Sequence, residues 1–152
     1  MCELFKAGRA PEGSFLRAGD SSQRQFATMT RCYREIGGLL TCNEVAQLVG
    51  RHADQSTSRV AHWIVDRSVV SLSWRAQIWL PLFQFESCDM SLRPGAERVV
   101  RELAPVFDDW DLAVWFTNPN GWLDDAMPLD VLAIDLAAVL DAARADRFVA
   151  KG

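Results

Sequence analysis

Two histidines, four cysteines and a run of carboxylates are the side chains of this chain that could carry chemistry. Catalysis would need a base beside a nucleophile, a metal cluster or a phosphate-binding loop. His52 falls in the turn between two predicted short helices, and His62 falls on the second of them. In both positions, surface or DNA-facing roles are favoured over catalysis. The "DDWD" run at 108–111 precedes a helical pattern, and negative charge at a helix start is explained by the helix dipole alone. With neither GxGxxG nor GxxxxGK[ST] present, we predict no catalytic residues and no enzyme.

Cysteine spacing indicates no metal site. The four cysteines, which form no CxxC pair, are Cys2, Cys32, Cys42 and Cys88. The even spacing of Cys42, His52 and His62 lacks the tight local pairs of a zinc site. We therefore expect free thiols, two or three of them partly buried, and no metal or other cofactor. No apolar run reaches the roughly 20 residues of a membrane helix, and the N-terminus lacks a signal-peptide core, so we expect a cytoplasmic protein without membrane contact.

A second group of polar residues could recognise nucleic acid. Gln, Ser and Thr side chains can read base edges, and Arg can read guanine or bind phosphates. Four of these residues recur at i, i+3, i+4 and i+7, so they share one acid-free helix face: Gln55, Ser58, Arg59 and His62. The full set of predicted DNA-contacting residues is Arg51, His52, Gln55, Ser58, Arg59, His62, Arg67 and Arg75. The alternative is an ordinary solvated helix face.

Charge is distributed unevenly along the chain, whose net charge is −4. Residues 1–70 hold nine Lys and Arg against seven Asp and Glu, whereas residues 71–152 hold seven against thirteen. A basic first half fits a part that faces nucleic acid, although a merely solvated surface explains the imbalance equally well. The negative total favours a homodimer, because a second copy would double the basic surface.

Hydrophobic periodicity predicts the elements that must position these residues. Residues 1–20, rich in Gly, Pro and Ser, predict a loose arm. Residues 21–36 form an amphipathic helix, ended by Gly37-Gly38, with an apolar face of Phe26, Met29, Tyr33 and Ile36. For this face we favour packing into a core over a dimer contact.

Two short helices about a turn follow, which is the skeleton of a helix-turn-helix. Thr41-x-x-Glu44 predicts a capping box at the first helix, and the second spans about Ser56–Asp66. The β-rich segment 69–80 then predicts two strands about an Arg75-Ala76 turn. Pro81 must end the second strand or place it at a sheet edge. A hairpin in this position indicates a wing with Arg75 at its tip.

The remaining chain has a helical pattern throughout. Pro94 and Pro128 each suit a first helical turn. Asp108 or Asp109 caps the helix between them, and a stripe of Leu136, Val139, Leu140 and Ala143 marks the last helix. The predicted fold is mainly α: a helix-turn-helix with a β-hairpin wing, followed by a small helical bundle. The predicted domains are residues 1–38, an arm and amphipathic helix; 39–89, the winged or MerR-like helix-turn-helix; and 90–152, the helical bundle.

Residues 39–148 resemble antitoxins of the Xre/MbcA/ParS type. The resemblance is carried by the order of "LLTCNEVAQLVG", "HWI", "WLPLFQFE", "LRPGAERVVREL", "DDWDLAVWFTNPN", "PLDVL" and "AVLDAARA". It implies a MerR-like or winged helix-turn-helix joined to a toxin-binding domain, in a protein that neutralises a cognate toxin and represses its own operator DNA. The toxin in such pairs often consumes NAD or transfers ADP-ribose.

Partner contacts follow from the resemblance and from the turn "WFTNPNGWLDDAM". Trp122 and the acids after it have less need of the core than Phe116 and Leu123, so we expect them to face a partner. The predicted partner-binding residues are Phe116, Pro119, Asn120, Trp122, Leu123, Asp124, Asp125, Pro128, Leu129, Arg147 and Phe148. The acidic "DDAM" and the linker "RHADQSTS" depart from the family pattern. A stand-alone DNA-binding regulator, or a protein-binding adaptor without DNA binding, remains the alternative.

Overall fold

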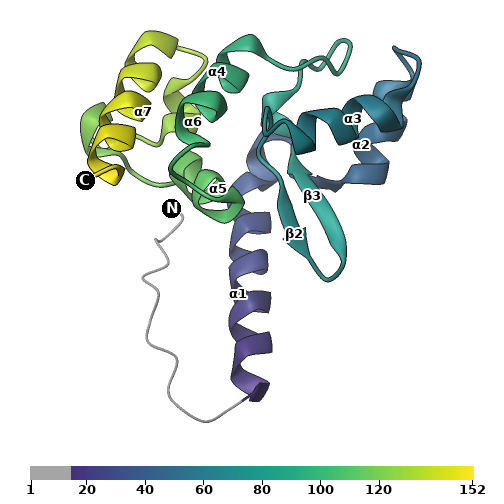
Figure 1. The fold of residues 1–152 in the computed structure, drawn as a ribbon, viewed down its shortest axis with the longest axis horizontal. Helices are drawn as coiled ribbons and strands as arrows, with labels where there is room; N and C mark the ends of the chain where they lie inside the picture. Colours follow the sequence, from purple (N-terminus) through teal and green to yellow (C-terminus); the bar gives the residue numbers. More distant parts are fainter. Residues whose placement is uncertain (1–14) are drawn as a thin grey trace.

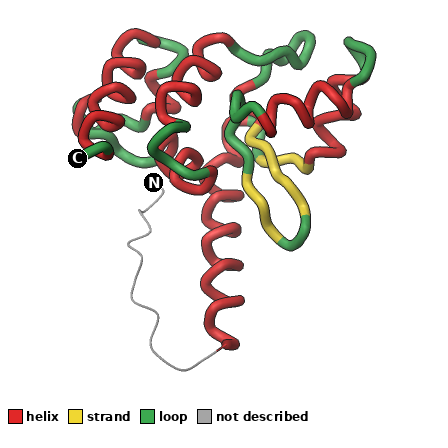
Figure 2. The backbone as a smooth tube through the Cα atoms, viewed as in Figure 1, coloured by secondary structure: helices red, strands yellow, loops and turns green. Residues whose placement is uncertain are grey.

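The computed structural model describes the backbone of residues 15–152 and the side chains from residue 21 onward. Over these residues the chain is mainly helical with a small three-stranded antiparallel sheet (Figures 1 and 2). The predicted mainly α class is confirmed at this level. The loose arm predicted for residues 1–20 falls largely outside the described residues, and it ends sooner than expected because the chain is helical from Phe15.

Helix α1 (Phe15–Tyr33) and the 3-10 turn η1 (Arg34–Ile36) end at Gly37, whose φ is 102°. Glycine adopts this region without a steric penalty, and a Cβ at Gly37 would come within 2.9 Å of Leu82 Cβ. Met29 and Tyr33 on the predicted apolar face are buried. The prediction that this face packs into a core is therefore confirmed.

The middle of the chain forms β1 (Leu39–Thr41), α2 (Cys42–Gly50), α3 (Ser56–Val65), β2 (Leu72–Trp74), β3 (Gln77–Pro81) and the 3-10 turn η2 (Leu82–Gln84). The sheet order is β1-β3-β2 with antiparallel pairs, in which Leu40 opposes Leu80 and Ser73 opposes Ile78. Pro81 is the last residue of the central strand, so it ends the strand as predicted, and the edge-strand alternative is wrong. Strand β1 was not predicted because three residues are too few to show a period.

Two local predictions in this region are confirmed. Glu44 N donates to Thr41 Oγ1 and Thr41 N donates to Glu44 Oε1, both at 3.2 Å, which is the expected capping box. Arg75 and Ala76, with φ of 50° and 59°, form the two-residue turn between β2 and β3. Positive φ at both positions matches the twist of the flanking strands, which explains why a two-residue connection suffices.

The C-terminal part forms α4 (Pro94–Leu103), α5 (Asp109–Thr117), the 3-10 turn η3 (Gly121–Leu123), α6 (Pro128–Val131) and α7 (Leu136–Ala150). Pro94 and Pro128 lie in first helical turns, and the Asp108 carboxylate accepts from Asp111 N to cap α5, as predicted. Asp135 caps α7 in the same way by accepting from Ala138 N. Helices α4 and α7 lie side by side (Figure 1).

Two hydrophobic clusters hold the described residues together. The smaller one joins α2 and α3 to the sheet through Val45, Val49, Val60, Leu80 and Phe85. The larger one contains the C-terminal helices together with α1 and the hairpin start, through Met29, Tyr33, Leu72, Phe83, Leu103, Phe116 and Val139. Helix α1 therefore shares its core with the C-terminal helices, a contact that no pattern in the sequence predicts.

The cysteines correct one expectation. Cys42 and Cys88 are free thiols, as expected, but Cys32 is disulfide-bonded. Cys2 lies outside the described residues. Among the described residues, no helix is both long and apolar enough to cross a membrane.

Candidate functional site

Helix α3 presents the polar face that the sequence predicts for DNA contact. Ser58, Arg59 and His62 are exposed, while Val60 on the opposite side is buried. Trp63 anchors that inner side, with its ring 5.7 Å from the ring of Phe85. The face is thus held outward by core packing on the other side of the same helix. Gln55, Ser58, Arg59 and His62 give it hydrogen-bonding groups and one guanidinium, and Asp66 follows at the end of the helix, near His62.

The start of α3 lies beside a hollow of about 570 Å³ formed with α2. Arg51, Ser56 and Thr57 line it from the junction between the two helices. Gln55 precedes α3 with a φ of 57° and places no side-chain cap on the helix. Because a helix start leaves backbone N–H groups unpaired, polar groups of side chains and backbone are both available here.

The tip of the β2–β3 hairpin contacts helix α1, which the sequence did not indicate. The Arg75 guanidinium lies 4.5 Å from the centroid of its neighbour Trp74, and Trp74 stacks on Phe26 of α1 at 4.0 Å. In Figure 1 the hairpin runs alongside α1. The exposed Arg75 is therefore positioned by α1 through an aromatic stack.

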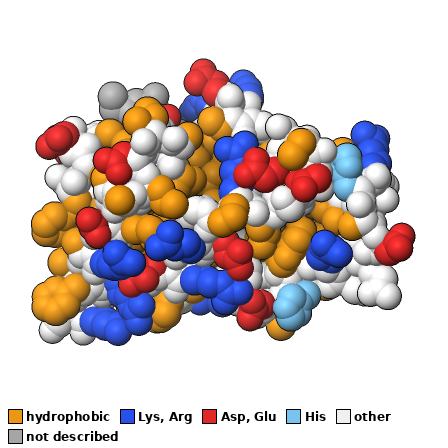
Figure 3. Space-filling model, turned by 90° about the horizontal axis from the view of Figure 1, so that it is seen from above, with side chains coloured by type: hydrophobic (Ala, Val, Ile, Leu, Met, Phe, Trp, Pro, Cys, Tyr) orange, Lys and Arg blue, Asp and Glu red, His pale blue; other side chains and the backbone are white. Residues whose placement is uncertain are grey.

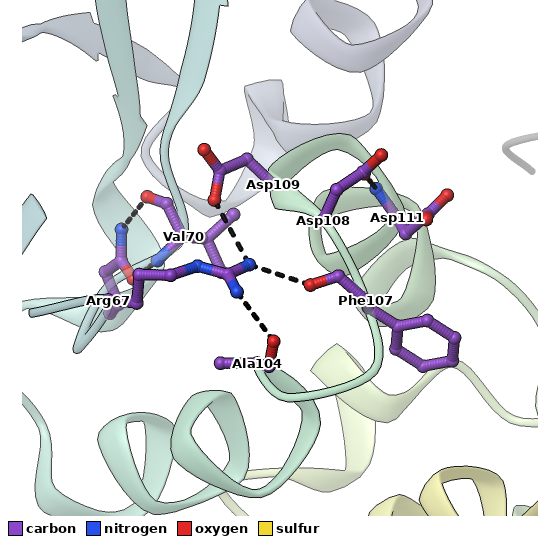
Figure 4. Close-up of polar contacts among 8 residues, drawn as sticks. Arg67, Val70, Ala104, Phe107, Asp108, Asp109 and Asp111 are labelled. Carbon is purple, nitrogen blue, oxygen red and sulfur yellow. Dashed lines mark hydrogen bonds and ion pairs between the residues drawn. The ribbon is translucent and has the colours of Figure 1, made fainter. Parts of the chain in front are cut away.

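Arg67 is not part of the open face of α3. Its guanidinium donates to the carbonyls of Ala104 at 2.6 Å and Phe107 at 2.7 Å, and it lies 3.4 Å from Asp109 Oδ1 (Figure 4). These acceptors lie at and between the ends of α4 and α5. They occupy the guanidinium N–H groups that Arg67 would need to bind a phosphate. The prediction that Arg67 contacts DNA is replaced by a structural role, because the residue turns inward at a φ of 54° after α3.

The predicted partner-binding residues separate into buried and exposed groups. Four of them are buried: Phe116, Asn120, Leu123 and Pro128. Phe116 and Leu123 pack into the core, whereas Asn120 still lines a groove beside the turn. The exposed members are Pro119, Trp122, Asp124, Asp125 and Phe148, whereas Leu129 and Arg147 are half-buried. Trp122 is 61% exposed, as its position in the sequence predicts. Arg147 is held by Glu102 of α4 at 3.3 Å.

A single carboxylate on α7 fixes this turn. Asp146 Oδ2 accepts from Trp115 Nε1 at 2.7 Å and from Asn120 Nδ2 at 2.9 Å, and Asp146 Oδ1 accepts from Trp122 Nε1 at 2.9 Å. Asn120 Oδ1 accepts from Trp122 N, which ties the backbone to the same network. Sequence reasoning missed Asp146, because its partners lie 24 to 31 residues away and no local pattern marks it.

The same residues line a groove of about 420 Å³ between α5, the turn and α7. We call it the acidic groove and define it by Phe107, Asp111, Trp115, Pro119, Trp122 and Asp146. Burial raises the pKa of the Asp111 carboxyl above its usual range, and the nearby Asp108 carboxylate adds to this rise. No Lys, Arg or His is found among the described residues that line the groove.

Charge is mixed elsewhere on the surface. The face in Figure 3 shows acidic and basic side chains interspersed, with both histidines toward the end where α2 and α3 lie. Within the described part of the chain, no group of three or more His, Cys, Asp or Glu could hold a metal ion. Neither protein-family models nor curated proteins nor solved structures gave a match to this chain.

Proposed function

We propose that the protein is a DNA-binding antitoxin that neutralises a cognate protein toxin by direct binding and represses its own operator. One observation carries the proposal: a single scaffold presents two chemically different exposed surfaces, the acid-free polar face of α3 and the aromatic, acidic turn at Trp122. In this proposal residues 39–89 act as a winged helix-turn-helix and residues 90–152 as the toxin-binding part.

The geometry supports the DNA-binding half at three points. Arg59 and His62 project from α3, the helix that would enter the major groove. Arg51 and the start of α3 offer a cation and backbone N–H groups to phosphates. Arg75 occupies the tip of the hairpin, where a wing follows the backbone. Arg67 is left out, since its guanidinium is bound within the chain.

The partner-binding half rests on Trp122. A tryptophan that is 61% exposed, yet fixed through its indole N–H to Asp146, offers a rigid aromatic surface at low entropic cost. Asp124 and Asp125 follow it and are also exposed. Aromatic residues in such positions are typical anchors of protein interfaces.

A stand-alone regulator is the second candidate function. The acidic groove would then bind a protein other than a toxin, or a second copy of this chain. The mixed surface charge in Figure 3 also keeps open an adaptor that has lost DNA binding.

Co-expression and gel shift together test the proposal. The neighbouring open reading frame should be toxic alone and harmless with this chain. Upstream DNA should shift at low salt, and Arg59→Ala or Gln55→Ala should each weaken binding by about 1–3 kcal/mol. Arg31→Ala, which removes an exposed arginine of α1, serves as the matched control with unchanged affinity.

A harmless neighbour, or a toxic one that this chain does not rescue, would refute the antitoxin function and leave the regulator. No shift at low salt would refute DNA binding and leave the adaptor.

A further inference from the structure

The acidic groove combines flat aromatic walls with uncompensated negative charge. Trp115 and Trp122 contribute indole rings, and Asp111 and Asp146 contribute carboxylates. The three donors to Asp146 are all neutral, so the hydrogen bonds position this carboxylate without cancelling its charge. The basic residue nearest to it in the sequence, Arg147, is engaged by Glu102 across α4.

This arrangement is organised before any ligand arrives. Trp122 would lose rotamer freedom on binding if it were loose, but its N–H is already held at 2.9 Å by Asp146 Oδ1. A carboxylate has about four acceptor positions, and Trp115, Asn120 and Trp122 occupy three of them on Asp146. One acceptor of Asp146 stays available to a donor entering the groove, and so does the part of the Asp111 carboxylate that does not contact Asp108.

Charge complementarity defines the occupant. A cation beside a tryptophan face gains electrostatic attraction from the ring, and a carboxylate adds a charge-assisted hydrogen bond. A guanidinium suits this groove better than an ammonium, because it is planar, stacks on aromatic rings and donates in several directions at once. The groove of about 420 Å³ is large enough for one such side chain with its stem.

We infer that the acidic groove is a docking site for an arginine side chain of the partner protein, with the guanidinium against Trp122 and hydrogen-bonded to Asp111 and Asp146. The inference rests on the proposed function, since it names the chemistry by which the partner is recognised at the Trp122 surface.

The test uses the full-length chain and a probe that carries only this chemistry. N-acetyl-arginine methylamide is titrated into the ¹⁵N-labelled protein to about 50 mM, because an isolated side chain should bind in the millimolar range. N-acetyl-citrulline methylamide, equal in shape but uncharged, is the matched probe, and sodium chloride controls for ionic strength. The indole N–H signals of Trp115 and Trp122 report occupancy.

We expect saturable shifts of both indole signals with the arginine probe and at least roughly tenfold weaker binding of the citrulline probe. Asp111→Asn should weaken arginine binding severalfold, and Asp141→Asn, an exposed acid of α7 outside the groove, should not. Asp146→Asn should abolish the shifts, but this variant also disturbs the turn. Asp111→Asn therefore decides.

Equal response to both probes, no saturable response, or full binding by Asp111→Asn would each overturn the assignment. Self-association of the protein that Asp111→Asn abolishes would also overturn it, because the occupant would then be a second copy. These results are independent of co-expression and gel shift, so failure of the groove and failure of the antitoxin function are distinguishable.

Discussion

Arg67 and Ala104 are joined by a 2.6 Å hydrogen bond across 37 residues of sequence. Because the same guanidinium also donates to Phe107 O at 2.7 Å, one side chain links the end of α3 to the α4–α5 connection. Asp66, just before it, bonds Arg101 of α4 at 2.7 Å. The proposed DNA-binding and toxin-binding parts are thus tied by polar contacts as well as by the shared core.

Arg67→Gln should destabilise the protein more than any exposed arginine substitution. The change removes a charged donor from two carbonyls, and the residue is 38% exposed, so we expect a loss of about 1–2 kcal/mol after allowance for solvent screening. Urea unfolding measures the change. Arg59→Gln on the open face of α3 is the control, and its free energy of unfolding should stay within about 0.5 kcal/mol of the unchanged protein. Equal stability of the two variants would contradict the linking role.

Gln84→Leu should be strongly destabilising although it keeps the size of the side chain. Gln84 is 1% exposed. Its side-chain amide accepts from Val70 N at 2.8 Å and donates to Val70 O at 2.9 Å. It therefore satisfies the backbone groups of Val70, which lies just before β2 and pairs with no strand. Leucine would leave both Val70 groups unpaired in the core, at a cost of about 2–4 kcal/mol. Chemical denaturation checks this, and Gln77→Leu on the exposed side of β3 is the control.

The elements of this fold were largely predictable because each has a local cause. The capping box at Thr41, the first-turn Pro94 and Pro128, and the Arg75-Ala76 turn all act within four residues of sequence. Strand β1 has a distant cause, because it pairs with β3 about forty residues later, and its three residues leave no periodic signal. The Gln84 amide belongs to the same group, since nothing nearby in sequence shows that it pairs with Val70.

The candidate site was predictable to a smaller extent. Periodicity placed Arg59 and His62 on an open face, and its position in a turn placed Trp122 outside the core. The burial of each residue confirms both. Periodicity could not show that Arg67 turns inward, because that depends on two carbonyls some forty residues later. Asp146 was missed for the same reason.

Trp122→Ala should weaken partner binding while leaving the fold nearly intact. The indole is 61% exposed and makes one hydrogen bond to Asp146, so the loss of stability should stay below about 1.5 kcal/mol. An interface anchor of this kind is worth about 2 kcal/mol or more in binding. Thermal melting and pull-down of the partner measure the two effects, with Ile134→Ala, 85% exposed, as the control. A large drop in melting temperature would show that Trp122 stabilises the fold, and would contradict its assignment as an exposed partner contact.

Asp66 should make the link between α3 and α4 sensitive to acid. Hydrogen bonds from Ser68 Oγ and then Arg101 lower the pKa of the Asp66 carboxyl below its ordinary value of 3.8. A carboxyl whose pKa is lower in the folded than in the unfolded chain contributes its full stability above pH 3.8. This contribution is lost as the pH falls below 3.8 and through the lowered pKa of the folded state. Asp66→Asn should flatten the acid limb of stability between pH 5 and pH 2.5, as followed by urea midpoints.

Arg101→Gln should reproduce part of the effect of Asp66→Asn, because it removes the ion pair but leaves the hydrogen bond from Ser68 Oγ, which lowers the pKa of Asp66 most. An acid limb that is unchanged in both variants would show that other carboxyls control it.

Tyr33→Phe tests the contact between α1 and α5. Tyr33 is the sole tyrosine of the chain, is fully buried, and donates its hydroxyl to Ala113 O at 2.6 Å. Ala113 O also accepts from Thr117 Oγ1, so it keeps one hydrogen bond when residue 33 is phenylalanine. The free energy of unfolding should therefore fall by about 1 kcal/mol.

Burial raises the pKa of Tyr33 far above its ordinary value of 10.0, since the charged phenolate cannot be solvated in the core. The folded state therefore keeps a proton that the unfolded chain releases. This contribution to stability is fully present below pH 10 and is lost as the pH rises above it. With a single tyrosine, absorbance at 295 nm reports this group alone. We expect phenolate absorbance to appear only together with the alkaline loss of circular dichroism, whereas titration near pH 10 in a folded protein would place Tyr33 in contact with water.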